Sequence, residues 1–248
     1  MEINSLQNTH VKQWAKLKQK KYRDQYHLFL VEGEHLIEEA EKAGLIECII
    51  ALEEKKHMFP SYEHYIVTRA ILDKLSATVS GSSIMALCHF PDRSTMKGNR
   101  FVLLDRVQDP GNIGTILRSA YAFGYDNIIL SPGCADIYNE KVIRSTQGAL
   151  FHLKTMVCPL QEYIHELKSK NIPVYATALH KDSIPLSSLP VQEKFAIIFG
   201  NEGQGVCDEV LAESDETVFI EMEQFESLNV AVAAGICLYA MNRVEGRN

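Results

Sequence analysis

The chain has 248 residues, of which 46% are hydrophobic and 23% are charged, the balance of an ordinary globular protein. This composition excludes a disordered chain, a collagen-like repeat and a small disulfide-stapled scaffold, and no apolar run reaches the roughly 18 residues that a membrane-spanning helix needs. The six cysteines are scattered without a Cys-x-x-Cys pair, so neither a disulfide framework nor a metal site is expected. We therefore expect a cytoplasmic protein with no secretory signal and no membrane partner.

The net charge of −7 is unevenly distributed along the chain. Residues 1–98 hold 13 basic and 13 acidic residues, whereas the remainder holds 12 basic and 19 acidic ones. Within residues 1–25, six basic side chains are accompanied by only two acidic ones. The overall charge argues against a protein that coats nucleic acid non-specifically, and the basic start of the chain leaves a local contact with nucleic acid open.

Residues 4–22 are predicted to form the first helix, because apolar residues recur there at three-residue spacing. Three lysines of this segment are spaced by four positions: Lys12, Lys16 and Lys20. In one continuous helix they would stack along a single face. Such a row is either an ordinary solvated face or an edge that contacts the phosphates of a nucleic acid.

The rest of the first half alternates short strands and helices. Residues 27–31 indicate a strand, and the helix that follows ends before Gly44, a residue type suited to a left-handed helix terminus. Further elements are predicted in the order strand, strand, helix: 48–52, 65–67 and 69–75. This pattern is typical of a small α/β domain, which we place at residues 1–92, followed by a polar linker at 93–99 and a second domain at 100–248.

The second domain is more strongly patterned. Five short runs are apolar or β-branched and are predicted to be strands: 101–105, 127–131, 173–178, 195–199 and 217–220. Helices are predicted between or after them: 115–123, 139–151, 160–170, 206–212 and 228–243. Runs that are apolar on both faces and separated by helices indicate a buried parallel sheet. Ligands of such sheets lie beyond the carboxyl ends of the strands, where three loops of this chain are expected.

The first of these loops precedes the helix expected at 115–123. Asn112 follows a proline and a glycine, and its role is either that of a turn or cap residue or that of a site residue. Arg118 would lie in the first turn of that helix, where a cation faces the positive end of the helix dipole unless an anion binds there. Neither a phosphate-binding Gly-Lys-Ser/Thr sequence nor a Gly-x-Gly-x-x-Gly fingerprint is present, which argues against a nucleotide-dependent oxidoreductase.

The second loop, residues 200–205, contains three glycines and one carboxylate, Glu202, directly after a buried strand. It is either a flexible turn or a binding loop in which backbone amides approach a ligand closely, and we favour the binding loop. The third loop contains Ser227, a natural N-cap, and leads into a helix whose small residues predict close packing of another helix. Residues 195–242 contain no Lys or Arg, and some of their carboxylates would favour a cationic ligand such as a sulfonium.

These three loops resemble, in the same order, the three motifs of the SpoU/TrmH family of RNA 2′-O-ribose methyltransferases. The matching residues are Asn112, Gly114 and Arg118 in the first motif, 200–205 in the second and 227–230 in the third. The resemblance covers about residues 99–245, including 144–149 between the first two motifs. Residues 5–90 are similar to the ribosomal-protein-like substrate-binding domain that many members carry.

The resemblance implies an α/β catalytic domain with a parallel sheet and a deep trefoil knot of the SPOUT type, which base rates alone would not suggest. It implies S-adenosylmethionine as cofactor, RNA as partner and a homodimer formed through the catalytic domains. The expected cofactor contacts are Thr177, Gly200, Ile220, Leu228 and Asn229. The expected RNA contacts are Lys12, Lys16, Lys20, Arg23 and Arg144.

The resemblance also implies that Arg118 takes the proton of the ribose hydroxyl. A guanidinium stays charged at neutral pH, so the alternative is that Arg118 binds the neighbouring phosphate and orients the hydroxyl. Four further residues would then position Arg118, the ribose and the helix ends: Asn112, Glu202, Ser227 and Asn229. The chain departs from the family at Glu221, where many members have proline, and its loop over residues 221–226 is one residue shorter.

Ribosomal RNA is the expected substrate, because the first domain is long enough to be a separate RNA-gripping module. Two alternatives differ from this expectation: transfer RNA as substrate, or a non-catalytic RNA-binding or ribosome-assembly factor with the same fold.

Overall fold

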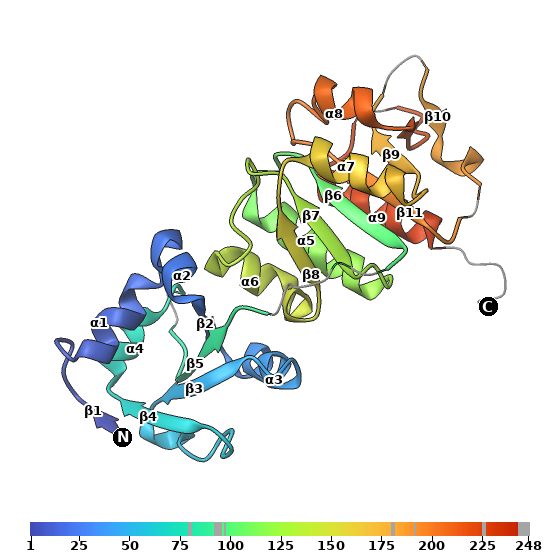
Figure 1. The fold of residues 1–248 in the computed structure, drawn as a ribbon. Coiled ribbons are helices and arrows are strands. Elements are labelled where there is room, and N and C mark those ends of the chain that lie inside the picture. The colour runs from blue at the N-terminus through green and yellow to red at the C-terminus, as the bar shows by residue number, and fades with distance from the viewer. Residues whose placement is uncertain are drawn as a thin grey trace. The chain divides into compact units, whose positions relative to one another are not determined.

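The computed structural model shows two compact units, residues 1–92 with 136–151 and residues 93–135 with 152–248 (Figure 1). The residues that the structure describes are 1–78, 81–91, 96, 98–179, 182–190, 192–224 and 227–242. Residues 136–151 were expected in the second domain, whereas in the structure they pack on the first unit. The ring centroids of Tyr138 and Phe151 lie 4.9 and 5.8 Å from that of Phe29, so this segment completes the apolar core there.

The first unit is built on a five-stranded mixed sheet with the order β1-β4-β3-β5-β2. Its strands are β1 (Glu2–Ile3), β2 (Leu28–Glu32), β3 (Ile46–Ala51), β4 (Glu63–Val67) and β5 (Ile84–His89). β5 runs antiparallel to both β2 and β3, and the pairs β3–β4 and β1–β4 are parallel. The α/β character predicted for this part of the chain is confirmed.

Among its described residues, the first unit also contains five helices and two 3-10 turns. They are α1 (Thr9–Lys16), α2 (Lys20–Tyr26), α3 (Glu34–Lys42), α4 (Arg69–Leu75), α6 (Glu140–Thr146), η1 (Glu53–Lys55) and η2 (Ala149–Phe151). The prediction of one helix over residues 4–22 is wrong, because α1 ends at Lys16 and Gln19 adopts an extended backbone. Lys20 therefore lies on α2 and does not continue the row formed by Lys12 and Lys16 on α1.

The second unit contains a seven-stranded sheet in which every described pairing is parallel, with the order β10-β12-β9-β11-β6-β7-β8. Its strands are β6 (Arg100–Leu104), β7 (Asn127–Leu130), β8 (Lys154–Val157), β9 (Val174–Thr177), β10 (Ile184–Pro185), β11 (Phe195–Phe199) and β12 (Glu216–Phe219). The predicted parallel sheet is confirmed. The trefoil knot that the resemblance implies stays a prediction.

The helices of the second unit cover the two faces of this sheet. They are α5 (Pro110–Ala122), α7 (Leu160–Ser169), α8 (Asp208–Glu213), α9 (Val230–Met241) and the short turn η3 (Leu186–Ser188). α7 and α8 share one apolar core with the strands, and α5 packs against α9 (Figure 1). A Cβ on Gly235 of α9 would lie 3.9 Å from the Ser119 hydroxyl of α5, so the predicted close packing of a helix on α9 is confirmed. In the described part of the chain, no helix combines the length and the apolar character required to cross a bilayer.

Candidate active site

A cavity of about 410 Å³ opens beyond the carboxyl ends of β9, β11 and β12, beside the start of α9. The cavity is lined by four of the residues predicted to contact the cofactor: Thr177, Gly200, Ile220 and Leu228. Glu202, Ser227 and Asn229 line the same cavity. Its size lies within the usual range of small-molecule sites, and its place in the sheet is where parallel α/β folds bind ligands.

Gly200 allows two parts of the second loop to touch. A Cβ on Gly200 would lie 2.0 Å from the carbonyl carbon of Gly205 and 2.1 Å from the nitrogen of Val206, distances that no side chain tolerates. Asn201 and Gly205 exchange two backbone hydrogen bonds of 2.9 Å, which close the loop on itself. The loop is therefore a fixed turn whose shape depends on the absence of a side chain at Gly200, rather than a flexible connection.

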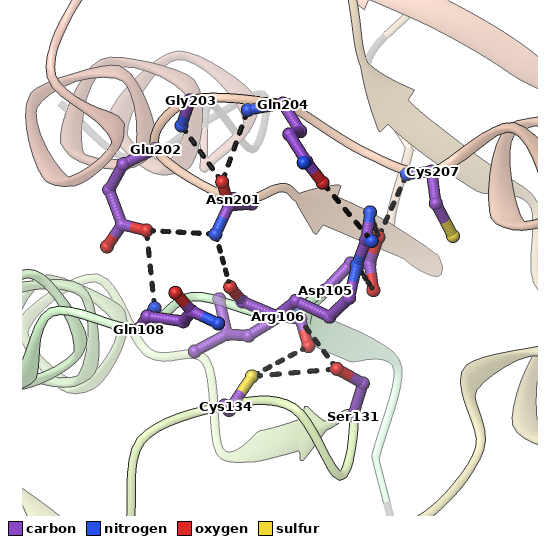
Figure 2. A network of polar contacts seen from close by, with 11 residues as sticks. Asp105, Arg106, Gln108, Ser131, Cys134, Asn201, Glu202, Gly203, Gln204 and Cys207 are labelled. Carbon is purple, nitrogen blue, oxygen red and sulfur yellow. Dashed lines mark hydrogen bonds and ion pairs between the residues drawn. The ribbon is translucent and has the colours of Figure 1, made fainter.

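The side chain of Asn201 ties this loop to the end of β6 (Figure 2). Its amide nitrogen donates to the carbonyl oxygen of Arg106 at 2.9 Å. Its amide oxygen accepts from the backbone N–H groups of Gly203 at 2.9 Å and Gln204 at 3.2 Å. One side chain thus satisfies backbone groups in two loops that come from neighbouring strands of the sheet.

Asp105 provides a second link between the same two loops (Figure 2). Asp105 is only 2% exposed, and its carboxylate accepts a hydrogen bond of 2.9 Å from the backbone N–H of Cys207. The Arg106 guanidinium lies 3.3 Å from Asp105 and 3.4 Å from the Gln204 amide oxygen, and the adjacent carboxylate raises the pKa of Arg106. A buried carboxylate is tolerated when, like that of Asp105, it is paired with a cation and accepts hydrogen bonds.

Glu202 accepts hydrogen bonds from the start of the first loop. The backbone N–H groups of Gln108 and Asp109 donate to its carboxylate at 3.2 and 3.0 Å, and the side chain of Asn112 donates at 3.0 Å. Burial raises the pKa of Glu202, but the bonds from Asn112, Asp109 and Gln108 outweigh burial and leave the pKa below its ordinary value. Glu202 is therefore ionised at neutral pH and serves as a hydrogen-bond acceptor.

Asn112 joins the first loop to the third. Its amide oxygen accepts a hydrogen bond of 3.0 Å from the side chain of Asn229, whose own oxygen caps α9 by accepting from Ala231 and Val232. Asn112, Glu202 and Asn229, predicted as site residues from three separate loops, thus form one chain of hydrogen bonds. Two expected capping roles differ: Asp109 caps α5 in place of Asn112, and Asn229 caps α9 in place of Ser227.

Arg118 is placed differently from the prediction. α5 begins at Pro110, five residues before the expected start, so Arg118 lies in the third turn of the helix. The argument from the helix dipole therefore does not apply to it. At about 1.5 Å and 100° per residue, Arg118 is about 9 Å along the helix from Asn112 and about 120° around it. It is exposed and makes no hydrogen bond to another residue that the structure describes.

The segment in which the chain departs from the family is partly described. Glu221 accepts a hydrogen bond from the Ser187 hydroxyl of η3, and this bond lowers the pKa of Glu221. Met222 lines the cavity, whereas residues 225–226 lie outside the described residues. The contact with Ser187 attaches the segment to the rest of the unit, a role that a proline at position 221 would not fill.

The predicted RNA contacts in the first unit separate into two groups. Lys12, Lys16 and Lys20 are exposed and remain available to a ligand. Arg23 is only 4% exposed; it donates to the Leu17 carbonyl that ends α1 at 2.6 Å and forms an ion pair with Asp136. The structure thus gives Arg23 a role in the core of the unit and does not support an RNA contact by this side chain.

Arg144, the fifth predicted RNA contact, lies on α6 in the first unit and is half-buried. One of its terminal nitrogens is enclosed and has no hydrogen-bond partner among the described residues. A contact between Arg144 and RNA stays a prediction.

Two exposed apolar residues at the cavity were missed in the sequence. Leu179 follows β9 and Met222 follows β12, and both line the opening. A large apolar side chain directly after a predicted parallel strand is a signal that points to a ligand site, because that end of the sheet is where ligands bind. Among the described residues no group of three or more His, Cys, Asp or Glu side chains is arranged to hold a metal ion.

Comparisons with known proteins agree with this site. Residues 99–239 match the SpoU rRNA Methylase family, and residues 8–86 match an MRM3-like substrate binding domain. The 23S rRNA (guanosine(2553)-2′-O)-methyltransferase RlmP of Bacillus subtilis is 39% identical over 243 residues, which is 96% of this chain and 98% of that protein.

Two solved structures show the same architecture over nearly the whole chain. An AdoMet-bound rRNA methyltransferase from Sinorhizobium meliloti is 26% identical with a TM-score of 0.87, and the match covers 97% of each chain. The SpoU methyltransferase AviRb from Streptomyces viridochromogenes, in complex with AdoMet, is 26% identical with a TM-score of 0.86, covering 97% of this chain and 100% of that one. This chain belongs to the SpoU family of rRNA methylases.

Proposed function

We propose that this protein transfers a methyl group from S-adenosylmethionine to a ribose 2′-hydroxyl of ribosomal RNA. The proposal rests on the meeting of three loops at one cavity. Asn112, Glu202 and Asn229, one from each loop, are linked by hydrogen bonds. Gly200 and Leu228 line the cavity beside them. Its family relatives supply the chemistry, since the Bacillus subtilis relative is named as a 23S rRNA 2′-O-methyltransferase and two structural relatives are described with AdoMet bound.

The cavity suits a nucleoside with a charged arm. The fixed turn at Gly200 brings backbone groups to the ligand without an intervening side chain, and Leu179 and Met222 provide apolar contact at the opening. Thr177 is held in place by a hydrogen bond of 2.9 Å from its hydroxyl to the Ile198 carbonyl. When bound, the cofactor supplies an electrophilic methyl group on a sulfonium, and the ionised Glu202 favours that positive charge.

The work left to the protein is mainly alignment, because methyl transfer is an in-line displacement between oxygen, carbon and sulfur. Arg118 is assigned to the phosphate next to the reacting ribose, where its guanidinium orients the 2′-hydroxyl. The hydroxyl proton leaves to water or to a phosphate oxygen, because an arginine stays charged at neutral pH. Glu202, whose oxygens already accept from four donors, is a positioning residue and not the proton acceptor. Asn112, itself bonded to Asn229, holds it in place.

We assign binding of the RNA substrate to the first unit. Residues 8–86 match a substrate binding domain, and the exposed Lys12, Lys16 and Lys20 provide positive charge for phosphates. The assignment to ribosomal rather than transfer RNA rests on the near-complete match to RlmP. We place the protein in the cytoplasm, in keeping with six cysteines that are all free thiols.

A homodimer is part of this proposal. α9 exposes three apolar side chains at helical spacing, Val232 (52%), Ile236 (39%) and Tyr239 (62%). Apolar residues that share one exposed face of a helix are typical of an interface. Light scattering of the purified protein should give twice the chain mass, and Ile236→Glu should give the mass of a single chain.

The experiment that tests the proposed activity separates cofactor binding from transfer. Calorimetry should show binding of S-adenosylmethionine to the purified protein, and incubation with ribosomal RNA from cells that lack the gene should yield 2′-O-methylated nucleosides. Donor binding without transfer to any ribosomal or transfer RNA would favour the non-catalytic alternative. Transfer to transfer RNA alone would overturn the choice of substrate.

A further inference from the structure

A cluster of lysines around two stacked tyrosines lies on α1 and α2 of the first unit. The rings of Tyr22 and Tyr26 are stacked, with centroids 6.2 Å apart and planes inclined by 16°. The ammonium groups of Lys16 and Lys21 lie 5.3 and 5.8 Å from the centroid of the Tyr22 ring. Two cations thus flank one aromatic ring that stacks on a second.

These lysines differ from several lysines elsewhere in the chain that pair with carboxylates. Five others lie within ion-pair distance of a carboxylate: Lys42, Lys55, Lys56, Lys168 and Lys170. Four exposed lysines of α1 and α2 have no carboxylate partner within the described part of the chain: Lys12, Lys16, Lys20 and Lys21. In a chain with a net charge of −7, an unpaired group of this kind is suited to bind an anion.

The two tyrosines have different supports. Tyr26 packs against the apolar core of the unit, so its position is fixed. Tyr22 is one helical turn away and half-buried, and its ring has Tyr26 and the ammonium groups of Lys16 and Lys21 as neighbours. An aromatic ring that is held from beneath loses little freedom when a ligand stacks on it.

We propose that the surface formed by Lys16, Lys21, Tyr22 and Tyr26 binds an unpaired segment of the RNA substrate, with a base stacked on the aromatic pair and phosphates bound by the lysines. Lysines combined with aromatic rings are the chemistry by which proteins bind single-stranded nucleic acid, because every base offers a face for stacking. A duplex keeps its bases stacked on one another and offers only its phosphates to such a surface. The inference rests on the proposed function, since it names the form of RNA that the first unit grips.

The test compares single-stranded with double-stranded RNA on the full-length protein. Fluorescence anisotropy would measure binding of an unstructured oligouridylate and of an RNA duplex of equal length at several salt concentrations. Tyr22→Leu should weaken binding of the single strand by about tenfold or more, since one base–aromatic stack is worth that much. Binding of the duplex should stay within about twofold, because the phosphate contacts are unchanged.

Matched variants separate stacking from charge and from folding. Tyr22→Phe keeps the ring and should bind both RNAs like the parent. Lys16→Gln with Lys21→Gln should weaken both RNAs and reduce the slope of log affinity against log salt by about 0.7 per lysine for the single strand. Tyr62→Leu is the control, because Tyr62 is a half-buried tyrosine of the same unit near the Glu41 carboxylate and should not affect RNA binding.

Several outcomes would overturn the inference. Tyr22→Leu that binds the single strand like the parent would exclude stacking on this ring. A parent that prefers the duplex, or that binds neither RNA yet methylates ribosomal RNA, would exclude the surface while leaving the methyltransferase assignment intact. If Tyr22→Leu loses single-strand binding as predicted but the parent transfers no methyl group, the result would contradict the proposed function and leave this surface intact.

Discussion

Asn229 donates a hydrogen bond of 3.0 Å to the side-chain oxygen of Asn112, although the two residues are 117 positions apart in the chain. Asn112 in turn donates to Glu202, so the order of the three loops is fixed by polar side chains at the opening of the cavity. Because each amide uses both its donor and its acceptor, a change at any one of them is transmitted to the others.

Asn229 has two roles that different substitutions separate. Asn229→Ala removes both the α9 cap and the bond to Asn112, so it should lower the free energy of unfolding by about 1 kcal/mol, the usual value of an N-cap. Asn229→Asp keeps the cap but loses the donor and adds a charge near Glu202. Urea denaturation should show near-parental stability for Asn229→Asp, and a transfer assay should show strongly reduced activity for both variants. Parental activity of Asn229→Asp would exclude a role for the amide donor.

Gly200→Ala tests the fixed turn of the second loop. The added Cβ would meet the backbone of Gly205 at 2.0 Å, so the loop must open. We expect a loss of about 1–3 kcal/mol in the free energy of unfolding, typical of overpacking, and at least about tenfold weaker cofactor binding by calorimetry. Gly203→Ala is the matched control, since its Cβ would lie 3.7 Å from the nearest atom, in ordinary contact. Equal effects of the two substitutions would contradict the account of Gly200.

The lowered pKa of Glu202 predicts a pH dependence. A carboxylate whose pKa is lower in the folded than in the unfolded state stabilises the fold above the ordinary carboxyl pKa, and this contribution disappears as the pH falls through the folded-state value. The difference in thermal stability between the parent and Glu202→Gln should therefore be constant near neutral pH and shrink below about pH 4. A difference that grows on acidification would show that the pKa of Glu202 is raised.

The ion pair between Arg23 and Asp136 predicts a structural role for Arg23. Removing one partner of a buried pair leaves an uncompensated charge, so Asp136→Asn should lower the free energy of unfolding by about 3–5 kcal/mol. Glu166→Gln, which breaks the exposed pair with Lys170, should cost no more than about 1 kcal/mol. Chemical denaturation measures both. Similar small losses for the two variants would show that Arg23 does not depend on Asp136.

Arg23→Met should weaken RNA binding only as far as it destabilises the first unit. Its slope of log affinity against log salt should match that of the parent, because a buried guanidinium releases no counterions from RNA. A reduced slope in Arg23→Met would instead support the contact between Arg23 and an RNA phosphate that was predicted from the sequence.

Much of the second unit was predictable from the sequence, and the exceptions have physical reasons. The strands β6, β7, β9, β11 and β12 are mostly apolar or β-branched, and all five were predicted to within two residues at either end. β8 was missed, because its sequence Lys-Thr-Met-Val, at the edge of the sheet, is short and forms neither a continuous apolar run nor an alternating pattern. The start of α5 was placed too late, although Asp109 followed by Pro110 is a strong signal of an N-cap and a first helical residue.

The first unit and the site show a different limit. A continuous helical pattern over residues 4–22 hid the break after Lys16, where the side chain of Arg23 donates to the carbonyl of Leu17. Likewise, the motifs identified Asn112 and Glu202, but not the supporting contacts of Asp105 and Asn201. Those contacts join loops that are far apart in the chain, so local pattern does not reveal them.

We predict that Arg118 contacts the RNA and not the cofactor. Arg118→Ala should abolish methyl transfer, while calorimetry should still show that the variant binds S-adenosylmethionine. Arg118→Lys keeps the charge but loses the paired donors that hold a phosphate, so its activity should lie between those of Arg118→Ala and the parent. Full turnover by Arg118→Ala would remove this residue from the mechanism.

The most direct test of the central claim follows the transferred methyl group. The protein would be incubated with isotopically labelled S-adenosylmethionine and with ribosomal RNA from cells lacking the gene, and the digested nucleosides would be analysed by mass spectrometry. We expect label on the ribose of one nucleoside, at a linkage that resists alkaline cleavage, and none with Arg118→Ala. Label on a base, or no label despite measurable binding of the donor, would contradict it.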